Sequence, residues 1–215
     1  GLKAFIPTAS PITRAGIGVL LDASDPNSYP TSGNFFYDTS GNGRHGTIQG
    51  SVGWVSNGQS SYFNFPGANT DYIYQTSGSA FKFKDICIVF KFDNLDWNYL
   101  LSYSTNSDRS IRNYQGITYN NSSIGDWAWG SATTYYLNGV ATTGNLTMAA
   151  DEWYILGGAA TNTVFVDNAR SYYMGTGYGG RHLDGKIAFL ALYDRVLTAD
   201  EQLQNYIALK SRFGL

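Results

Sequence analysis

The feature that most constrains this chain is a succession of short apolar segments separated by residues that form turns. Gly, Asn, Ser and Asp are frequent in the intervening stretches, and these residues close the tight turns that join neighbouring strands. Short strands separated by turn residues in this way are typical of an all-β sandwich. The predicted strands span residues 18–23, 46–49, 61–65, 72–75, 85–92, 99–103, 115–119, 134–138, 153–157, 164–167 and 185–193.

Two of these segments have the pattern of central strands. In residues 85–92 one face is entirely apolar, and Cys87 and Val89 make the other face half apolar. Residues 187–193 are apolar on both faces. Such strands belong in the middle of a layered sheet, because a solvated face would carry alternating polar residues. The apolar face of the first strand consists of Ile86, Ile88, Phe90 and Phe92.

One helix is predicted at the C-terminal end of the sequence. Thr198 is a suitable N-cap, and Glu201 three residues later completes a capping box. Gly214 provides a stop signal at the other end. We expect the buried stripe of this helix to consist of Leu203, Tyr206, Ile207 and Phe213.

A length of 215 residues fits one domain, which we place at residues 17–215. Residues 1–16 contain two prolines and show no periodic pattern. We therefore expect an extended N-terminal arm that docks on a neighbouring molecule or on its own domain.

The composition excludes several classes of partner. The formal net charge is −2 and no run of Lys or Arg occurs, whereas nucleic-acid binding needs clustered basic residues, so we expect no nucleic-acid partner. No apolar stretch approaches the roughly 20 residues that span a bilayer, so we expect no membrane partner. The single cysteine, Cys87, lies within an apolar run and is expected to be a buried core residue.

The sequence offers no recognisable catalytic group. Glycoside hydrolysis needs two carboxyl groups that flank the scissile bond, but the only two glutamates, Glu152 and Glu201, stand far apart in the sequence and in no shared motif. His45 and His182 have no metal-ligand spacing between them. We therefore expect a protein that is not an enzyme.

Carbohydrate binding is better supported by the residue pattern. Sugars present apolar C–H faces beside hydroxyl groups, so their sites combine aromatic rings with amide or carboxylate groups. Asp126, Trp127 and Trp129 provide this combination, and the two Trp residues share one side of an extended segment. Tyr178, in the Tyr- and Gly-rich segment 171–178, provides a second candidate. The alternative is that Trp127 and Trp129 point inward and pack the sandwich.

Two groups of residues are candidate calcium ligands. Calcium takes about six to eight oxygen atoms from carboxylates, amides and carbonyls. Asp93, Asn94 and Asp96 follow a predicted central strand and form the first group. The second consists of Asp38 and Asn42, with Asp184 approaching from the other end of the chain. Asp and Asn are also common turn residues, and this remains the alternative for both groups.

Four motifs in order resemble a known family. They are residues 18–23 (GVLLDA), 37–47 (YDTSGNGRHGT), 136–140 (YLNGV) and 183–201, which runs from LDGKIA to LYDRVLTADE. Together they resemble the laminin-G-like domains of the concanavalin A-like lectin-glucanase superfamily. This resemblance implies an all-β fold: a two-sheet antiparallel jelly-roll sandwich with one short C-terminal helix. It also implies a binding or adhesion module, in some members calcium-bound, of the kind found in bacteriophage virion proteins.

The predicted function is therefore that of a non-enzymatic lectin-fold structural protein on a bacteriophage particle, as a capsid decoration or fibre-type subunit. The expected partners are other virion proteins, bound through the N-terminal arm, and a host-surface carbohydrate. We expect a homo-oligomer located on the virion surface. Two alternatives stay open: a secreted, extracellular carbohydrate-binding adhesion module and, disfavoured by the missing glutamate pair, a glycoside hydrolase.

Overall fold

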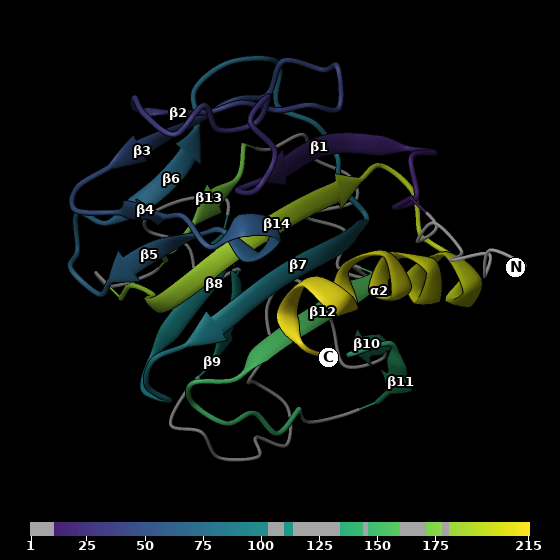
Figure 1. Ribbon diagram of the computed structural model, residues 1–215. Helices are drawn as coiled ribbons and strands as arrows, with labels where there is room; N and C mark the ends of the chain where they lie inside the picture. The colour runs from purple at the N-terminus through teal and green to yellow at the C-terminus, as the bar shows by residue number, and fades with distance from the viewer. Residues whose placement is uncertain (1–10, 103–109, 114–133, 144–145, 160–170, 178–180) are drawn as a thin grey trace, which may run out of the picture.

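Two antiparallel sheets form the protein (Figure 1). The computed structural model describes residues 11–102, 110–113, 134–143, 146–159, 171–177 and 181–215. The larger sheet has the order β11-β10-β12-β7-β14-β5-β4, with β1 also paired to β14, and the smaller has the order β2-β3-β6-β13-β8-β9. The predicted two-sheet antiparallel sandwich with one C-terminal helix is confirmed.

The strand bounds are as follows. The larger sheet contains β1 (Ile17–Asp22), β4 (Gly53–Val55), β5 (Tyr62–Pro66), β7 (Asp85–Phe92), β10 (Tyr135–Leu137), β11 (Val140–Thr142), β12 (Trp153–Ala159) and β14 (Asp184–Tyr193). The smaller contains β2 (Phe35–Phe36), β3 (Gly46–Gln49), β6 (Tyr72–Gln75), β8 (Asn98–Ser102), β9 (Ser110–Asn113) and β13 (Tyr173–Met174). A 3-10 turn, η1 (Gly58–Ser60), and the helix α2 (Ala199–Phe213) complete the described elements.

β7 and β14 lie at the centre of the larger sheet, as the sequence predicts. β7 pairs with β12 on one side and with β14 on the other. The second edge of β14 is shared, because β5 pairs with Asp184–Ile187 and β1 with Phe189–Tyr193. The register shifts between Ile187 and Phe189, a one-residue irregularity at the point where the neighbour changes.

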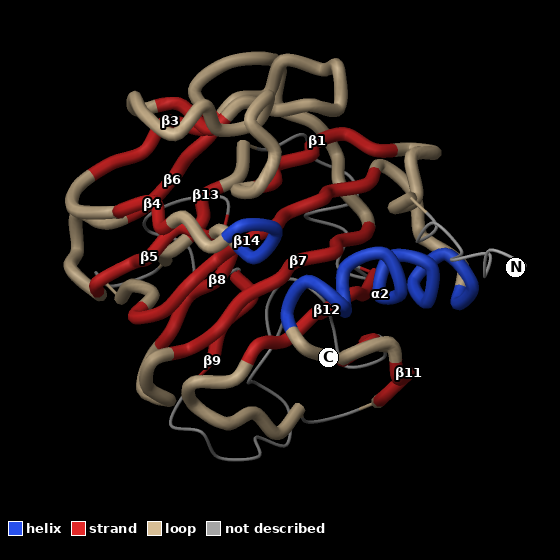
Figure 2. Tube along the Cα trace, viewed as in Figure 1, coloured by secondary structure: helices blue, strands red, loops and turns tan. Residues whose placement is uncertain are grey.

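The main core lies between the two sheets, and the larger sheet has a second apolar face under α2. The all-apolar face of β7 joins the main core, together with inward residues of the smaller sheet such as Ile73 and Met174. Cys87 and Val89 belong to a separate cluster with Leu209 and Phe213 of the helix. Figure 2 shows the helix lying over the strands of this sheet. The half-apolar second face of β7 is thus explained by a third layer.

The helix has the predicted ends but a different buried face. Thr198 and Glu201 form the capping box, and Gly214 adopts the left-handed C-cap conformation. The predicted stripe is wrong for Leu203 and Ile207, which are 43% and 40% exposed. The buried residues of the helix are Gln202, Asn205, Leu209 and Phe213. Gln202 and Asn205 are buried because each forms a hydrogen bond with the sheet below, to Asp85 and Tyr193 respectively. Among the described helices, none is long and apolar enough to cross a membrane.

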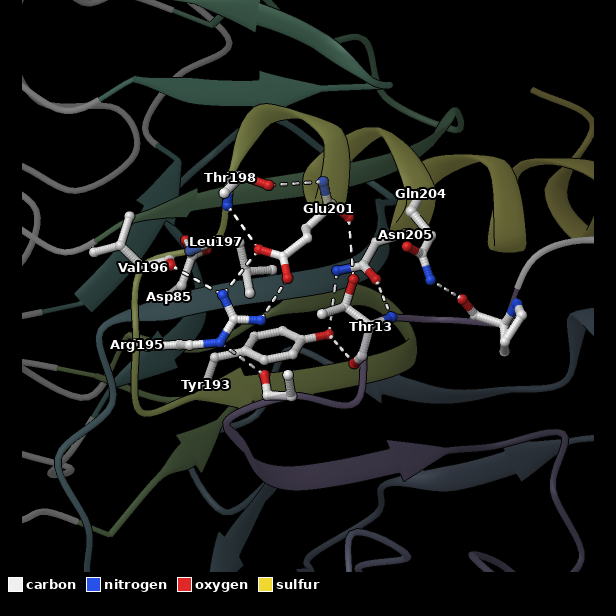
Figure 3. Close-up of polar contacts among 12 residues, drawn as sticks. Thr13, Asp85, Tyr193, Arg195, Val196, Leu197, Thr198, Glu201, Gln204 and Asn205 are labelled. Atoms are coloured by element: carbon white, nitrogen blue, oxygen red, sulfur yellow. Dashed lines mark hydrogen bonds and ion pairs between the residues drawn. The ribbon is translucent and has the colours of Figure 1, made fainter.

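The described part of the predicted arm, residues 11–16, lies on the protein's own domain (Figure 3). The backbone N–H of Thr13 donates to the Asn205 side-chain oxygen at 2.8 Å, and the Tyr193 hydroxyl donates to the Thr13 carbonyl at 3.2 Å. Arg195 donates to the carbonyl of Ala15 at 3.1 Å. Thr13 is buried as a result. Residues 1–10 lie outside the described residues.

Candidate carbohydrate-binding face

Three tyrosines form a continuous aromatic surface on the outer face of the smaller sheet. Tyr72 and Tyr74 alternate with the core residue Ile73 in β6, and Tyr173 precedes the core residue Met174 in β13. Because successive side chains of a strand point to opposite faces, the three tyrosines point away from the core. We call Tyr72, Tyr74 and Tyr173 the tyrosine face.

The rings of the tyrosine face lie close to one another. Tyr173 pairs with Tyr74 across the two strands, and their ring centroids are 5.5 Å apart with planes only 17° from parallel. The centroid of Tyr72 lies 5.6 Å from that of Tyr74 and 6.3 Å from that of Tyr173. All three side chains are half-buried. Such a group offers apolar ring surface together with phenolic hydroxyl groups.

Polar groups border this surface on the next strand. In β3, Thr47 is paired with Tyr74 and Gln49 with Tyr72, so both lie on the same outer face. Beyond β3, Phe35 of β2 pairs with Thr47 and is 45% exposed. The face thus combines aromatic rings with a hydroxyl and an amide, the mixture that suits a sugar ring and its hydroxyl groups.

Burial and the neighbouring phenols of Tyr72 and Tyr74 raise the pKa of Tyr173 above its usual value. Tyr173 therefore stays a neutral phenol at any physiological pH. A neutral phenol both donates and accepts a hydrogen bond, whereas a phenolate only accepts. Tyr173 therefore keeps its hydrogen-bond donor.

The sequence-predicted carbohydrate residues do not coincide with this face. Asp126, Trp127, Trp129 and Tyr178 lie outside the described residues. Within the predicted segment 171–178, Tyr172 is fully buried and donates to the Arg44 carbonyl at 2.9 Å, while Tyr173 faces outward. The alternating Tyr72-Ile73-Tyr74 pattern was the available signal, but the pairing of β6 with β13 is a long-range contact that no local pattern encodes.

Asp38 and Asn42, from one predicted calcium group, build a turn. The Asp38 carboxylate accepts hydrogen bonds from the backbone N–H groups of Leu20, Ser40 and Arg44 at 2.9, 2.9 and 3.0 Å, and from the Ser40 hydroxyl at 2.9 Å. The Asn42 amide donates to the carbonyl of Gly18 at 3.2 Å. These donors use the carboxylate oxygens that a cation would need.

Asp184 is separated from Asp38 and joins the other predicted group. Asp38 lies beside Leu20, which pairs with Ala191, and seven positions of β14 separate Ala191 from Asp184, about 20 Å of extended strand. At its own end of β14, Asp184 accepts a hydrogen bond from the Asn94 amide. The structure therefore places Asp184 with the residues that follow β7.

The group that follows β7 already contains a positively charged side chain. The Lys186 ammonium forms an ion pair with Asp93, and burial, together with the nearby charge of Asp93, raises the pKa of Asp184. The backbone N–H of Asp96 donates to the Asn94 side-chain oxygen at 3.0 Å. No group of three or more His, Cys, Asp or Glu side chains in the described part of the chain is placed to hold a metal. In both groups, the described carboxylates of Asp38, Asp93 and Asp184 already contact protein donors.

The residues considered for catalysis have structural partners. Glu201 forms a bidentate ion pair with Arg195 and caps α2, which lowers its pKa to about 2. His45 accepts a hydrogen bond from the Asp38 backbone at 3.0 Å. Complete burial raises the pKa of the Cys87 thiol, so a reactive thiolate does not form there.

Comparison with known proteins defines the fold. Neither a family model nor a curated protein matches this sequence. The chain is similar in structure to Domain 4 of AbnA, a GH43 extracellular arabinanase from Geobacillus stearothermophilus solved in complex with arabinotriose. The identity is 13% and the TM-score 0.58, over 88% of this chain and 98% of that one.

In two further structures, this chain matches one part of a longer chain. Trypanosoma rangeli sialidase, in complex with the inhibitor DANA, is 11% identical with a TM-score of 0.57, over 93% of this chain and 35% of the sialidase. A mutant of botulinum HCR/D is 11% identical with a TM-score of 0.52, over 90% of this chain and 51% of that chain. These likenesses show a shared β-sandwich fold, and this chain corresponds to one part of each larger protein.

Proposed function

We propose that this protein is a non-enzymatic carbohydrate-binding module whose tyrosine face stacks against sugar rings. The observation that carries the proposal is the near-parallel pair Tyr74 and Tyr173, with Tyr72 beside both. Aromatic rings held outward by a rigid sheet bind the C–H face of a sugar without losing conformational freedom. Thr47 and Gln49 border the rings and supply hydrogen bonds to the hydroxyl groups.

The related folds favour the same conclusion. Domain 4 of AbnA, which this chain matches over nearly its whole length, was solved with arabinotriose bound. The sialidase match extends over about a third of that enzyme, as expected for one module of a larger protein. A binding role carried over from these neighbours is an analogy between folds, and the tyrosine face is the feature of this chain that gives it a chemical basis.

The wide separation of the two glutamates in the sequence supports the non-enzymatic part of the proposal. Glycosidases of this fold class need a general acid and a second carboxylate around one bond. Of the two glutamates in the chain, Glu201 caps a helix and pairs with Arg195, and Glu152 is an exposed residue immediately before β12.

The location of the module is a separate part of the proposal. The resemblance to laminin-G-like domains of bacteriophage virion proteins supports a place on a virus particle, where the module would bind host-surface carbohydrate. A homo-oligomer attached through the N-terminal arm fits this role. The alternative is an extracellular adhesion module, and both placements use the same binding face.

A glycan array tests the binding role, with the purified protein screened in calcium and again in chelator. We then expect Tyr74→Ala and Tyr173→Ala each to weaken binding to the selected glycan by about tenfold, which is about 1.4 kcal/mol. Tyr136→Ala, which removes a half-buried tyrosine from the larger sheet, is the matched control and should bind normally. Undiminished binding by the Tyr74→Ala/Tyr173→Ala double variant would overturn the assignment to this face.

A further inference from the structure

A second feature of the surface is a basic pocket at the loops beside β1. It has a volume of about 370 Å³. It lies among β1, the turn after β2, the segment that leads into β7 and the residue that follows β14. We define the basic pocket by Asn42, Arg44, Phe81, Lys82, Lys84 and Asp194.

Arg44 is held in place by neutral groups. Its Nε donates to the Ser79 carbonyl and its Nη1 to the Gly18 carbonyl, both at 2.8 Å. The guanidinium carbon lies 4.3 Å from the centre of the Phe81 ring. Since both acceptors are neutral carbonyls, the positive charge is not cancelled. These contacts use two of the five N–H donors of the guanidinium group.

The two lysines share one side of the segment that leads into β7. Phe81 and Phe83 are buried in the main core, so the alternating Lys82 and Lys84 point the other way. Lys82 is exposed and Lys84 is half-buried. Among the residues that the structure describes, neither lysine has an ion-pair partner. The backbone of Lys84 is fixed, because its N–H donates to the Tyr193 carbonyl at 2.6 Å.

The pocket is therefore positive in a protein that is negative as a whole. Three cationic side chains and one carboxylate, Asp194, line it, which leaves an excess of two positive charges, whereas the formal net charge of the chain is −2. Charges of one sign gathered around a concave site concentrate ligands of the opposite sign there.

We propose that the basic pocket binds an acidic saccharide through its carboxylate or sulfate group. Arg44 and the two lysines supply N–H donors for the oxyanion, and a guanidinium group matches the planar geometry of a carboxylate. Asp194 disfavours a bare anion but accepts hydrogen bonds from hydroxyl groups. A ligand with an oxyanion and hydroxyl groups on one small ring satisfies both requirements.

This inference goes beyond the tyrosine face and does not depend on it. The two sites are connected through the protein, since the Arg44 carbonyl accepts the hydrogen bond of Tyr172, the neighbour of Tyr173. Each site nevertheless uses different side chains and a different chemistry. The tyrosine face recognises the apolar face of a sugar, and the basic pocket recognises its charge.

The test is a titration of the full chain monitored by ¹H–¹⁵N NMR at constant ionic strength. The probes are sodium glucuronate, N-acetylglucosamine 6-sulfate, glucose and sodium sulfate. We expect the first two to shift the amide signals of Lys82 and Lys84 with saturation, and glucose to leave them unchanged. The acidic sugar that binds more tightly shows whether the pocket prefers a carboxylate or a sulfate group. Equal shifts with glucose, or tighter binding of inorganic sulfate than of both acidic sugars, would overturn the proposal.

Variants assign the effect to the pocket. Lys82→Gln/Lys84→Gln should weaken binding of the acidic sugar at least tenfold while the spectrum remains that of a folded protein. Lys210→Gln, in the last turn of α2, removes a charge elsewhere and should bind normally. An equal loss in both variants would indicate a general charge effect and refute the assignment. A ligand at the tyrosine face would shift the amide signals of Tyr74 and Tyr173, whereas a ligand in the basic pocket would shift those of Lys82 and Lys84, so failure of one proposed site is distinguishable from failure of the other.

Discussion

The side-chain amide of Gln202, on α2, donates a 2.8 Å hydrogen bond to the carboxylate of Asp85, the fully buried first residue of β7. The same carboxylate accepts hydrogen bonds from the backbone N–H groups of Leu197 at 2.8 Å and Ile86 at 2.7 Å. One buried acid therefore connects the central strand to the loop before the helix and to the helix itself. Asp85 and Leu197 lie close together in Figure 3.

Asp85 should make stability depend on pH in an unusual direction. Burial raises its pKa from 3.8 to about 6, although its hydrogen bonds act in the opposite sense. The folded protein therefore binds this proton more tightly than the unfolded chain does. The contribution of Asp85 to stability is fully present below pH 3.8 and is lost as the pH rises to about 6. Urea denaturation between pH 4 and pH 7 measures this loss.

The matched variant is Asp85→Asn. An amide cannot accept all three hydrogen bonds, so we expect a loss of about 1–3 kcal/mol. The pH dependence between pH 4 and pH 6 should nevertheless become flatter than in the parent protein. A slope that is unchanged by the substitution would mean that another group is responsible.

Asn205 should fix residues 11–16 to the helix. Its side chain accepts from the Thr13 N–H at 2.8 Å and donates to the Tyr193 hydroxyl at 3.1 Å, in a fully buried position. Asn205→Ala leaves buried partners unsatisfied and should cost about 1–3 kcal/mol. Hydrogen exchange should then speed up at the Thr13 amide. Leu203→Ala, on the exposed side of the same helix, should change stability by less than about 0.5 kcal/mol. A larger loss of stability for Leu203→Ala than for Asn205→Ala would contradict this account and support the helix face expected from apolar periodicity.

Lys186 should reduce the repulsion between two carboxylates at the end of β14. It pairs with Asp93, whose charge also acts on Asp184. Lys186→Gln should lower stability by about 1 kcal/mol, since the pair is partly exposed to solvent. Calcium should restore thermal stability in this variant and leave the parent protein unchanged, because only the variant leaves the carboxylates without a cation. A calcium-induced rise in the melting temperature of the parent would contradict this account.

Gly18 should be required for the basic pocket. A Cβ atom at this position would overlap the ring of Phe81, against which Arg44 packs. Gly18→Ala should therefore destabilise the protein by about 1–3 kcal/mol through overpacking and weaken glucuronate binding in the NMR titration. Gly53→Ala, where a Cβ would meet open space, is the control. Normal glucuronate binding by Gly18→Ala would show that Phe81 does not position Arg44.

The sequence predicts the central strands and the helix ends well because local pattern determines them. The observed β7 and the predicted segment 85–92 have the same bounds, and the alternation of its side chains gives both of its faces. The capping box and Gly214 need only neighbouring residues. Short strands are harder to predict from the sequence. β2 and β13 have two residues each and are defined by their pairing with neighbouring strands.

The sites depend on long-range pairing, which explains the larger errors there. Asp184 joins Asn94 because β14 lies beside β7, and the sequence placed it instead with Asp38. The tyrosine face needs the pairing of β6 with β13, whose residues are far apart in the sequence. The helix face was mispredicted because apolar periodicity does not register Gln202 and Asn205, which are buried through hydrogen bonds.

The shared edge of β14 has a consequence for the order of folding. Its partners β1 and β5 come from the first third of the chain, and β14 itself is the last strand. During synthesis, the edges of β1, β5 and β7 that pair with β14 therefore stay unpaired until β14 itself has been made. Contacts between such distant segments make folding slow and expose intermediates to aggregation. A chain shortened before residue 184 would lose the centre of its larger sheet, so completion of this sheet depends on β14.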